Sequence, residues 1–209
     1  GVASFNGIVR GSMSSPNIVG QLRASNLRVR GTEWRLLEAD VDADSSVASL
    51  RNAVLEPMSR GRIAFNATAG LAKWSYTSSS VIQANLAASQ LNVSDLLKVA
   101  GVRAPITGIL SATAKVQGTQ LNPTGQGEIT IQRGTIQDEE ISLAKLTFAG
   151  AAGEVNGKLS VRLPAGAIDG VVAIRPREQT YRGKLTVNDF KLAQLQTLKM
   201  RHVDAAGTM

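Results

Sequence analysis

The sequence contains no cysteine and only one histidine, His202. The lack of cysteine excludes disulfide bonds, thiolate metal sites and a cysteine nucleophile. A single histidine, with no second imidazole and no thiolate, lacks the usual companions of a zinc site or a catalytic triad. We therefore interpret His202 as a solvated loop residue. We expect no metal, no other cofactor and no catalytic residue, and hence a protein that is not an enzyme.

Aromatic residues are also scarce, at 4% of the chain, although apolar residues make up 43%. Nearly all of the apolar content is Ala, Val, Leu and Ile, which suits an extended sheet better than a compact globule. No apolar run approaches the roughly 18 residues that a membrane-spanning helix needs, and no signal peptide is present. Residues 1–4 already read as a strand in progress, and residues 205–209 stop where we expect another strand to begin, so we interpret both ends of the sequence as cuts within a longer chain.

Basic residues outnumber acidic ones, giving a formal net charge of +7. They are scattered, however, and no Lys/Arg run has the interleaved aromatics typical of a nucleic-acid site, so we expect no nucleic-acid partner. A polar surface in contact with anionic lipid headgroups would use the same charge.

Alternation of apolar and polar residues dominates the chain, which predicts strands with one apolar face. Residues 158–163 read Lys-Leu-Ser-Val-Arg-Leu, with three aliphatics on one side. Gly, Asn and Pro recur at short intervals, and Asn156-Gly157 has the composition of a hairpin turn. We predict an all-β, mainly antiparallel and elongated sheet of about twelve strands.

Two short stretches have helical spacing instead. Residues 92–101 could be capped by Ser94 at the start and by Gly101 at the end. The second stretch begins at residue 188 and carries Leu192, Leu195 and Leu198. We interpret both as short helices that cover a sheet end, because each is too short to bind a membrane alone.

The chain also repeats itself. A shift of 107 positions (11 to 118) places Gly11, Pro16 and Gly20 on Gly118, Pro123 and Gly127. A shift of 99 positions (86 to 185) superimposes Leu86, Leu91, Leu96 and Gly108 on Leu185, Phe190, Leu195 and Gly207, and with them the two helical stretches. The predicted division is therefore a partial β-repeat at 1–91, a linking helix at 92–101, a second β-repeat at 102–188, and a helix with the start of another repeat at 189–209.

The repeated phrase, Val-Arg-Gly-Ser-Met-Ser-Ser-Pro-Asn-Ile-Val-Gly-Gln-Leu at 9–22 and its counterpart at 116–129, resembles the TamB/AsmA-like proteins. Residues 84–110 similarly resemble that family's linking helix and next strand. The resemblance implies a long periplasmic protein of a diderm bacterium, anchored in the inner membrane by an N-terminal helix that this sequence does not include. It implies tandem β-repeats curled into an open apolar groove that conducts phospholipid towards the outer membrane, in outer-membrane biogenesis, with a partner there.

Together with the alternation, the resemblance predicts the lining of such a groove. These residues are Leu22, Ala24, Leu86, Ile129, Ile131, Leu159, Val161, Leu163, Leu185 and Val187. Alternation alone does not separate an open groove from the closed core of a sandwich. A periplasmic or extracellular β-solenoid adhesin, which binds polysaccharide or a protein through an exposed polar and aromatic face, is the alternative function.

Other clusters have simpler explanations than a site. Residues 40–44, Asp-Val-Asp-Ala-Asp, lack the Gly and Glu of a calcium-binding EF-hand loop and fit the outward face of a strand. Residues 138–140, Asp-Glu-Glu, fit an exposed hairpin tip. Trp34, Trp74 and Tyr76 could form a sugar platform, but ordinary packing is the preferred interpretation.

Overall fold

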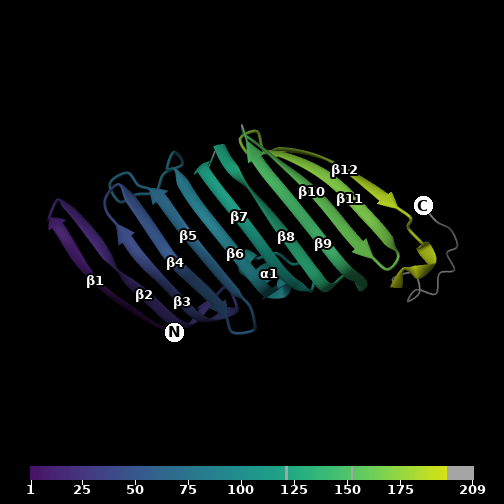
Figure 1. Cartoon of the computed structure of the whole chain (residues 1–209), viewed down its shortest axis with the longest axis horizontal. Helices are drawn as coiled ribbons and strands as arrows, with labels where there is room; N and C mark the ends of the chain where they lie inside the picture. Colours follow the sequence, from purple (N-terminus) through teal and green to yellow (C-terminus); the bar gives the residue numbers. More distant parts are fainter. Residues whose placement is uncertain (121, 152, 197–209) are drawn as a thin grey trace.

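The computed structural model is one open sheet of twelve antiparallel strands, each hydrogen-bonded to the next in sequence (Figure 1). The structure describes residues 1–120, 122–151 and 153–196. The first six strands are β1 (Val2–Ser12), β2 (Ser15–Val29), β3 (Thr32–Ala43), β4 (Val47–Pro57), β5 (Arg62–Gly70) and β6 (Ile82–Asn92). The last six are β7 (Ile109–Thr119), β8 (Asn122–Ile136), β9 (Glu139–Ala151), β10 (Glu154–Leu163), β11 (Gly166–Arg175) and β12 (Thr180–Asn188). The prediction of a mainly antiparallel all-β chain is therefore confirmed, and the sheet does not close.

Short hairpins explain why sequence neighbours are also neighbours in space. Between β2 and β3, Arg30 and Gly31 both have positive φ, at 47° and 81°. Gln137 and Asp138 do the same between β8 and β9, at 46° and 69°. Two consecutive residues of positive φ are the mark of a type I′ turn, whose twist matches that of the flanking strands.

The hairpin expected at Asn156-Gly157 is wrong, because both residues lie inside β10. A Cβ at Gly157 would lie 2.8 Å from Val172 Cγ1 and 3.5 Å from Leu146 Cδ1. This glycine therefore lets neighbouring side chains approach the strand and does not turn the chain.

The strand bounds repeat at the spacing found in the sequence. From Val2 to Ile109 and from Ser15 to Asn122 the distance is 107 positions, and the ends of these two strand pairs keep it. Near the end of β6, Gln90 has a φ of 53°, and 99 positions later Asp189, just after β12, has a φ of 50°. The units that correspond are therefore six strands each.

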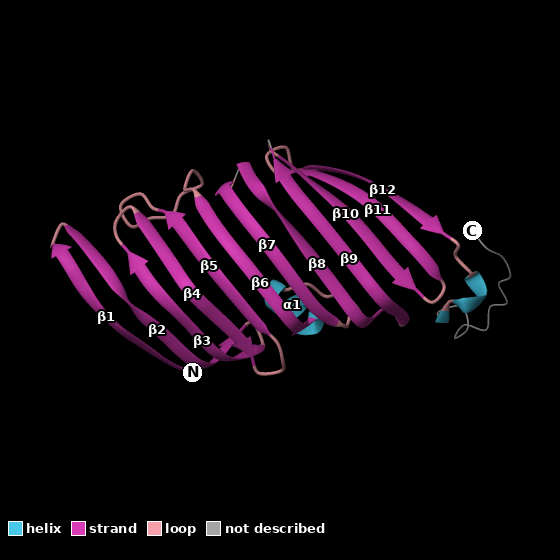
Figure 2. Ribbon diagram, in the orientation of Figure 1, coloured by secondary structure: helices cyan, strands magenta, loops and turns pink. Residues whose placement is uncertain are grey.

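One α-helix, α1 (Val93–Ala100), follows β6 and is shown in cyan in Figure 2. It ends at Gly101 (φ 70°) as expected, but Asn92 and not Ser94 precedes its first residue. Of the second expected helix, the described residues up to Leu195 form a 3-10 turn, η1 (Leu192–Gln194), and no α-helix. The rest of that stretch, with Leu198 and His202, lies outside the described residues. No helix in the described part of the chain is long and apolar enough to cross a membrane.

One cluster of buried side chains lies where α1 meets the sheet. Trp34, Leu91 and Val93 are 6%, 3% and 5% exposed. Thr32 Oγ1 donates to the Asp95 carbonyl oxygen over 3.2 Å, and Ser59 Oγ donates to Asp95 Oδ2 over 2.7 Å. The helix therefore closes a small core at one end of the strands, and most of the sheet has no second layer.

Candidate functional site

All ten residues predicted to line a groove lie on one face of the sheet, here called the apolar face. Directly paired residues of antiparallel strands point to the same side, so the register traces this face from strand to strand. One row from β4 to β12 consists of Leu55, Ile63, Ala88, Ala112, Ile129, Leu146, Leu159, Gly170 and Leu185. The next row, from β8 to β12, holds Ile131, Ala144, Val161, Ile168 and Val187.

The apolar face is continuous because residues with positive φ shift the alternation of apolar and polar side chains by one position where it would otherwise be lost. Asn52 and Gln90, with φ near 51° and 53°, lie where the pairing register shifts between Leu50 and Ala53 and between Ala88 and Leu91. Each is an extra residue in a β-bulge, so Ala53 lies on the same face as Leu50, and Leu91 on the same face as Ala88, although each pair is three positions apart. Sequence alternation alone did not reveal these bulges.

Much of this face remains open to solvent. Leu185, Val187 and Leu86 are 68%, 42% and 37% exposed, whereas Ala24 is buried and the other predicted residues are half-buried. Apart from neighbouring strands, substantial contacts between elements of the described chain involve only α1, with β3 and β6. The structure thus has a broad amphipathic sheet with one largely uncovered apolar side.

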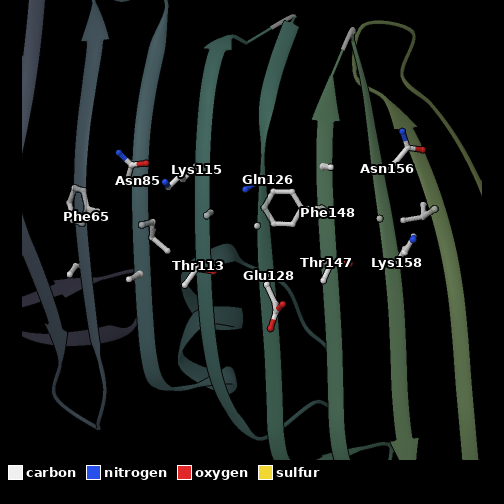
Figure 3. Close-up of a pocket in the computed structure, with 18 of the residues that line it drawn as sticks. Phe65, Asn85, Thr113, Lys115, Gln126, Glu128, Thr147, Phe148, Asn156 and Lys158 are labelled. Atoms are coloured by element: carbon white, nitrogen blue, oxygen red, sulfur yellow. The ribbon is translucent and has the colours of Figure 1, made fainter.

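A large hollow lies elsewhere. It has a volume of about 1340 Å³ and crosses nine strands, from β4 to β12 (Figure 3). From β6 onwards it touches three consecutive residues on every strand, such as Gln126, Gly127 and Glu128 on β8. The next apolar-face residue, Ile129, does not border it. The hollow therefore opens on the opposite, polar face, and of the ten predicted lining residues only Leu86 touches it.

Small side chains on the polar face create this hollow. Ala87, Ala149 and Ala173 lie among longer polar neighbours and leave the main chain as a floor. The residues come from strands far apart in sequence, so alternation gives no signal of it. Only the register brings them together: Ala149 and Ala173 both face Asn156 in one row, and Ala87 faces Thr113 in the next row.

The hollow carries a strong excess of positive charge. It is bordered by Arg62, Lys115, Lys158, Arg182 and Lys184, with Glu128 as its one acid. Glu128 Oε2 lies 2.9 Å from Lys145 Nζ, and Arg182 Nη2 lies 3.4 Å from Glu154 Oε1. The other four cations make no ion pair within the described part of the chain. Amides of Asn66, Asn85, Gln126 and Asn156 border the same space and can both donate and accept hydrogen bonds.

Carboxylates on the polar face are held by local partners. Asp40 and Asp42 accept hydrogen bonds from Gln21 and Asn17, 3.3 and 3.2 Å away. Asp44 lies in the next turn, where the Ser46 hydroxyl and the N–H groups of Ser46 and Val47 hold its pKa below the ordinary value.

At the β12 end of the sheet, the hydrogen bond from Arg175 lowers the pKa of Glu154. The described residues contain no group of three or more His, Asp or Glu side chains that could hold a metal ion. These hydrogen bonds favour the charged forms of Asp44 and Glu154, whose lowered pKa is the opposite of the raised pKa of a general acid.

The aromatic side chains do not form one platform. Trp34 is buried beside α1, whereas Trp74 and Tyr76, 43% and 48% exposed, lie in the loop between β5 and β6.

Comparison with family models, with curated proteins and with solved structures finds no match.

Proposed function

We propose that this chain binds lipid acyl chains on its apolar face, as an internal segment of a periplasmic conduit between the inner and outer membranes. The observation that supports the proposal is the apolar-face row from β4 to β12, which includes Leu159 and Leu185 and is aliphatic on every strand except β11, where Gly170 lies. The sequence resemblance to TamB/AsmA-like proteins favours phospholipid as the cargo, and with it an inner-membrane anchor in the parent chain. No reacting side chain is required for this activity.

The energetics favour such a surface. Exposing an acyl chain of about 16 carbons to water costs on the order of 13 kcal/mol, at about 0.8 kcal/mol for each CH₂. Nine strands about 4.8 Å apart provide a surface almost 40 Å long. A chain lying along it loses most of its contact with water, while the headgroup stays at the rim.

A pair of matched variants tests the proposal. L159D/L185D places two carboxylates on the apolar face, and K158A/K184A alters the adjacent residues of the same strands on the polar face. Each pair lowers the net charge by two. We expect phospholipid to co-purify with the wild type and with K158A/K184A, but not with L159D/L185D, as measured by lipid extraction and mass spectrometry.

Folding is checked in parallel by circular dichroism and thermal melting. Leu185 is 68% exposed, so L185D alone provides a variant that should fold even if the double variant does not. Wild-type protein without lipid, or a folded L159D/L185D that retains it, would contradict lipid binding on this face.

The polar hollow favours a second function, binding of an acidic polysaccharide as in an adhesin or interaction module. Its cations Arg62, Lys115, Lys158 and Lys184, which form no ion pair with any described residue, can neutralise carboxylates, and its amides can bond sugar hydroxyls. The same variants separate the two functions. Loss of alginate binding in K158A/K184A and its retention in L159D/L185D, by calorimetric titration, would support the second function, and no binding to the wild type would refute it.

A further inference from the structure

The loop between β5 and β6, residues 71–81, is longer than the hairpin turns of the sheet. It is held against the turn between β3 and β4. The Leu71 N–H donates to the Ser46 carbonyl oxygen over 2.6 Å, and the Trp74 N–H donates to the Ser45 carbonyl oxygen over 3.0 Å. The loop is therefore a fixed part of the rim formed by the strand ends.

The tip of this loop has a strained backbone. Ala72 and Ser75 exchange two backbone hydrogen bonds, of 2.8 and 3.0 Å, and enclose Lys73 and Trp74, whose φ angles are 50° and 69°. Two consecutive residues of positive φ form a type I′ turn, for which Asn and Gly are strongly preferred. A bulky residue at positive φ is a clear outlier, and such strain collects at binding sites. Here the strained turn presents an ammonium and an indole on consecutive residues.

The side chains at the tip are open to solvent. Trp74 and Tyr76 are 43% and 48% exposed, and Lys73 is exposed as well. Lys73 makes no ion pair with any described residue. The carboxylate of Asp44, in the adjacent turn, is occupied by hydrogen bonds from the Ser46 hydroxyl and two backbone N–H groups. The tip therefore offers a cation beside two rings that each have an apolar body and a polar N–H or O–H group.

The tip lies where the apolar face of β5 and β6 ends. Ala69 and Ile82 are the last paired residues before the loop, and Ile82 lies on the same face as Leu86 because successive side chains of a strand alternate. A phospholipid with its acyl chain on that face and its headgroup at the rim would therefore meet the loop.

We propose that Lys73, Trp74 and Tyr76 form a phospholipid headgroup site. The Lys73 ammonium binds the phosphate, and the two rings contact the glycerol region. This site rests on the proposed binding of acyl chains to the apolar face.

The chemistry of the three side chains favours a lipid headgroup as the occupant. Trp and Tyr rings collect at the level of the headgroups in membranes, because their apolar bodies leave water while their polar groups keep hydrogen bonds. An ammonium forms charge-assisted hydrogen bonds with a phosphate. A neutral sugar could also stack on such rings, but it would use neither Lys73 nor the neighbouring apolar face.

Fluorescence of Trp74 tests the site, because the chain has only one other tryptophan, Trp34, which is buried. The delipidated 209-residue chain is incubated with vesicles of phosphatidylcholine brominated either near the glycerol or near the methyl end of the acyl chain, and is then separated from them. Bromine quenches an indole only at close range. We expect bromine near the glycerol to quench several-fold more than bromine near the methyl end, and W74F to lose this difference.

Lipid extraction from the same samples separates two kinds of failure. Bound lipid without quenching of Trp74, or with equal quenching by both lipids, would overturn the headgroup site and leave acyl-chain binding intact. No bound lipid would refute acyl-chain binding, and the site with it. A change in Trp74 emission with alginate, and none with phospholipid, would indicate a sugar site and would also overturn the proposal.

Competition between phosphatidylcholine and diacylglycerol of the same acyl chains, in mixed vesicles, tests the phosphate contact. We expect K73Q to lose about five-fold of the preference for the phospholipid, which corresponds to about 1 kcal/mol for one cation near a lipid surface. R177Q is the matched control, because Arg177 is exposed in the turn between β11 and β12 and makes no ion pair with any described residue. An unchanged preference in K73Q, or an equal loss in R177Q, would refute the contact. If inorganic phosphate alone changes Trp74 emission as strongly as lipid does, the site is one for free phosphate and the headgroup assignment is wrong.

Discussion

Truncation of two leucines on β6 tests which part of the sheet contributes most to its stability. Leu91 and Leu86 lie on the same strand and the same face, but Leu91 is 3% exposed beside α1, whereas Leu86 is 37% exposed. Leu91→Ala leaves a cavity in a closed core, for which losses of about 2.7–5 kcal/mol are typical. Leu86→Ala removes a side chain that water already reaches, so a loss of about 1–2 kcal/mol is expected from area alone.

Urea unfolding measures the difference. Trp34, buried near α1, reports on this region if Trp74 is replaced by Phe in all variants, because the chain has only two tryptophans. We expect the midpoint to fall two- to three-fold further for Leu91→Ala than for Leu86→Ala, with unchanged slopes. Equal losses would mean that Leu86 is as enclosed as Leu91. In delipidated protein such enclosure could come only from the protein itself, and the apolar face could then not be a lipid surface.

Three further changes test local features of the sheet by the same unfolding measurement. Gly127→Ala should lower the free energy of unfolding by about 1–3 kcal/mol through overpacking, because the new Cβ would lie 2.4 Å from Phe148 Cζ and 2.6 Å from the Thr113 carbonyl oxygen. Gly183→Ala should cost little, because the atom nearest to its Cβ is 3.3 Å away. Equal losses for the two variants would contradict the packing around Gly127. Arg133→Val should cost about 1–2 kcal/mol, since φ is 49° there and a β-branched residue resists it, whereas Arg133→Asn should be tolerated. Asp44→Asn should destabilise the folded chain at neutral pH, because the pKa of Asp44 is lower in the folded state than in the unfolded state. The stability that the charged carboxylate contributes is complete above the unfolded-state pKa and is lost as the pH falls through the folded-state pKa. The difference in stability between the variant and the wild type should therefore vanish in acid. A difference that persists in acid would refute that assignment.

Strand content and the composition of the apolar face could be predicted from the sequence because both depend on local alternation. Leu159, Val161 and Leu163 needed only the period of two to be placed on one side. The turn chemistry was less reliable. Asn156-Gly157 has the composition of a hairpin, yet the glycine is needed where Val172 and Leu146 approach β10. That requirement comes from neighbouring strands and is invisible in the local sequence.

The hollow on the polar face could not be predicted for a related reason. It depends on the size of side chains such as Ala87, Ala149 and Ala173, which come from β6, β9 and β11 and are placed in two adjacent rows of the polar face only by the strand register. The second helix failed differently. Leucines at a spacing of three suit both an α-helix and a 3-10 turn, and a short segment has too few hydrogen bonds for propensity to decide.

The left-handed residues connect the repeat to the apolar face. Without an extra residue at Gln90, strict alternation from Ala88 would turn Leu91 to the polar side, and α1 would lose its main contact with the sheet. Asp189 has the same backbone conformation before Phe190, which is also buried, at 9% exposed. The residue types differ between the two positions while the conformation and the burial of the next side chain agree. What recurs at this spacing is a residue with positive φ that returns the next apolar side chain to the same face. Different residue types, such as Gln90 and Asp189, can adopt this backbone conformation. This explains why the repeat is clear in spacing while few identical residues mark it.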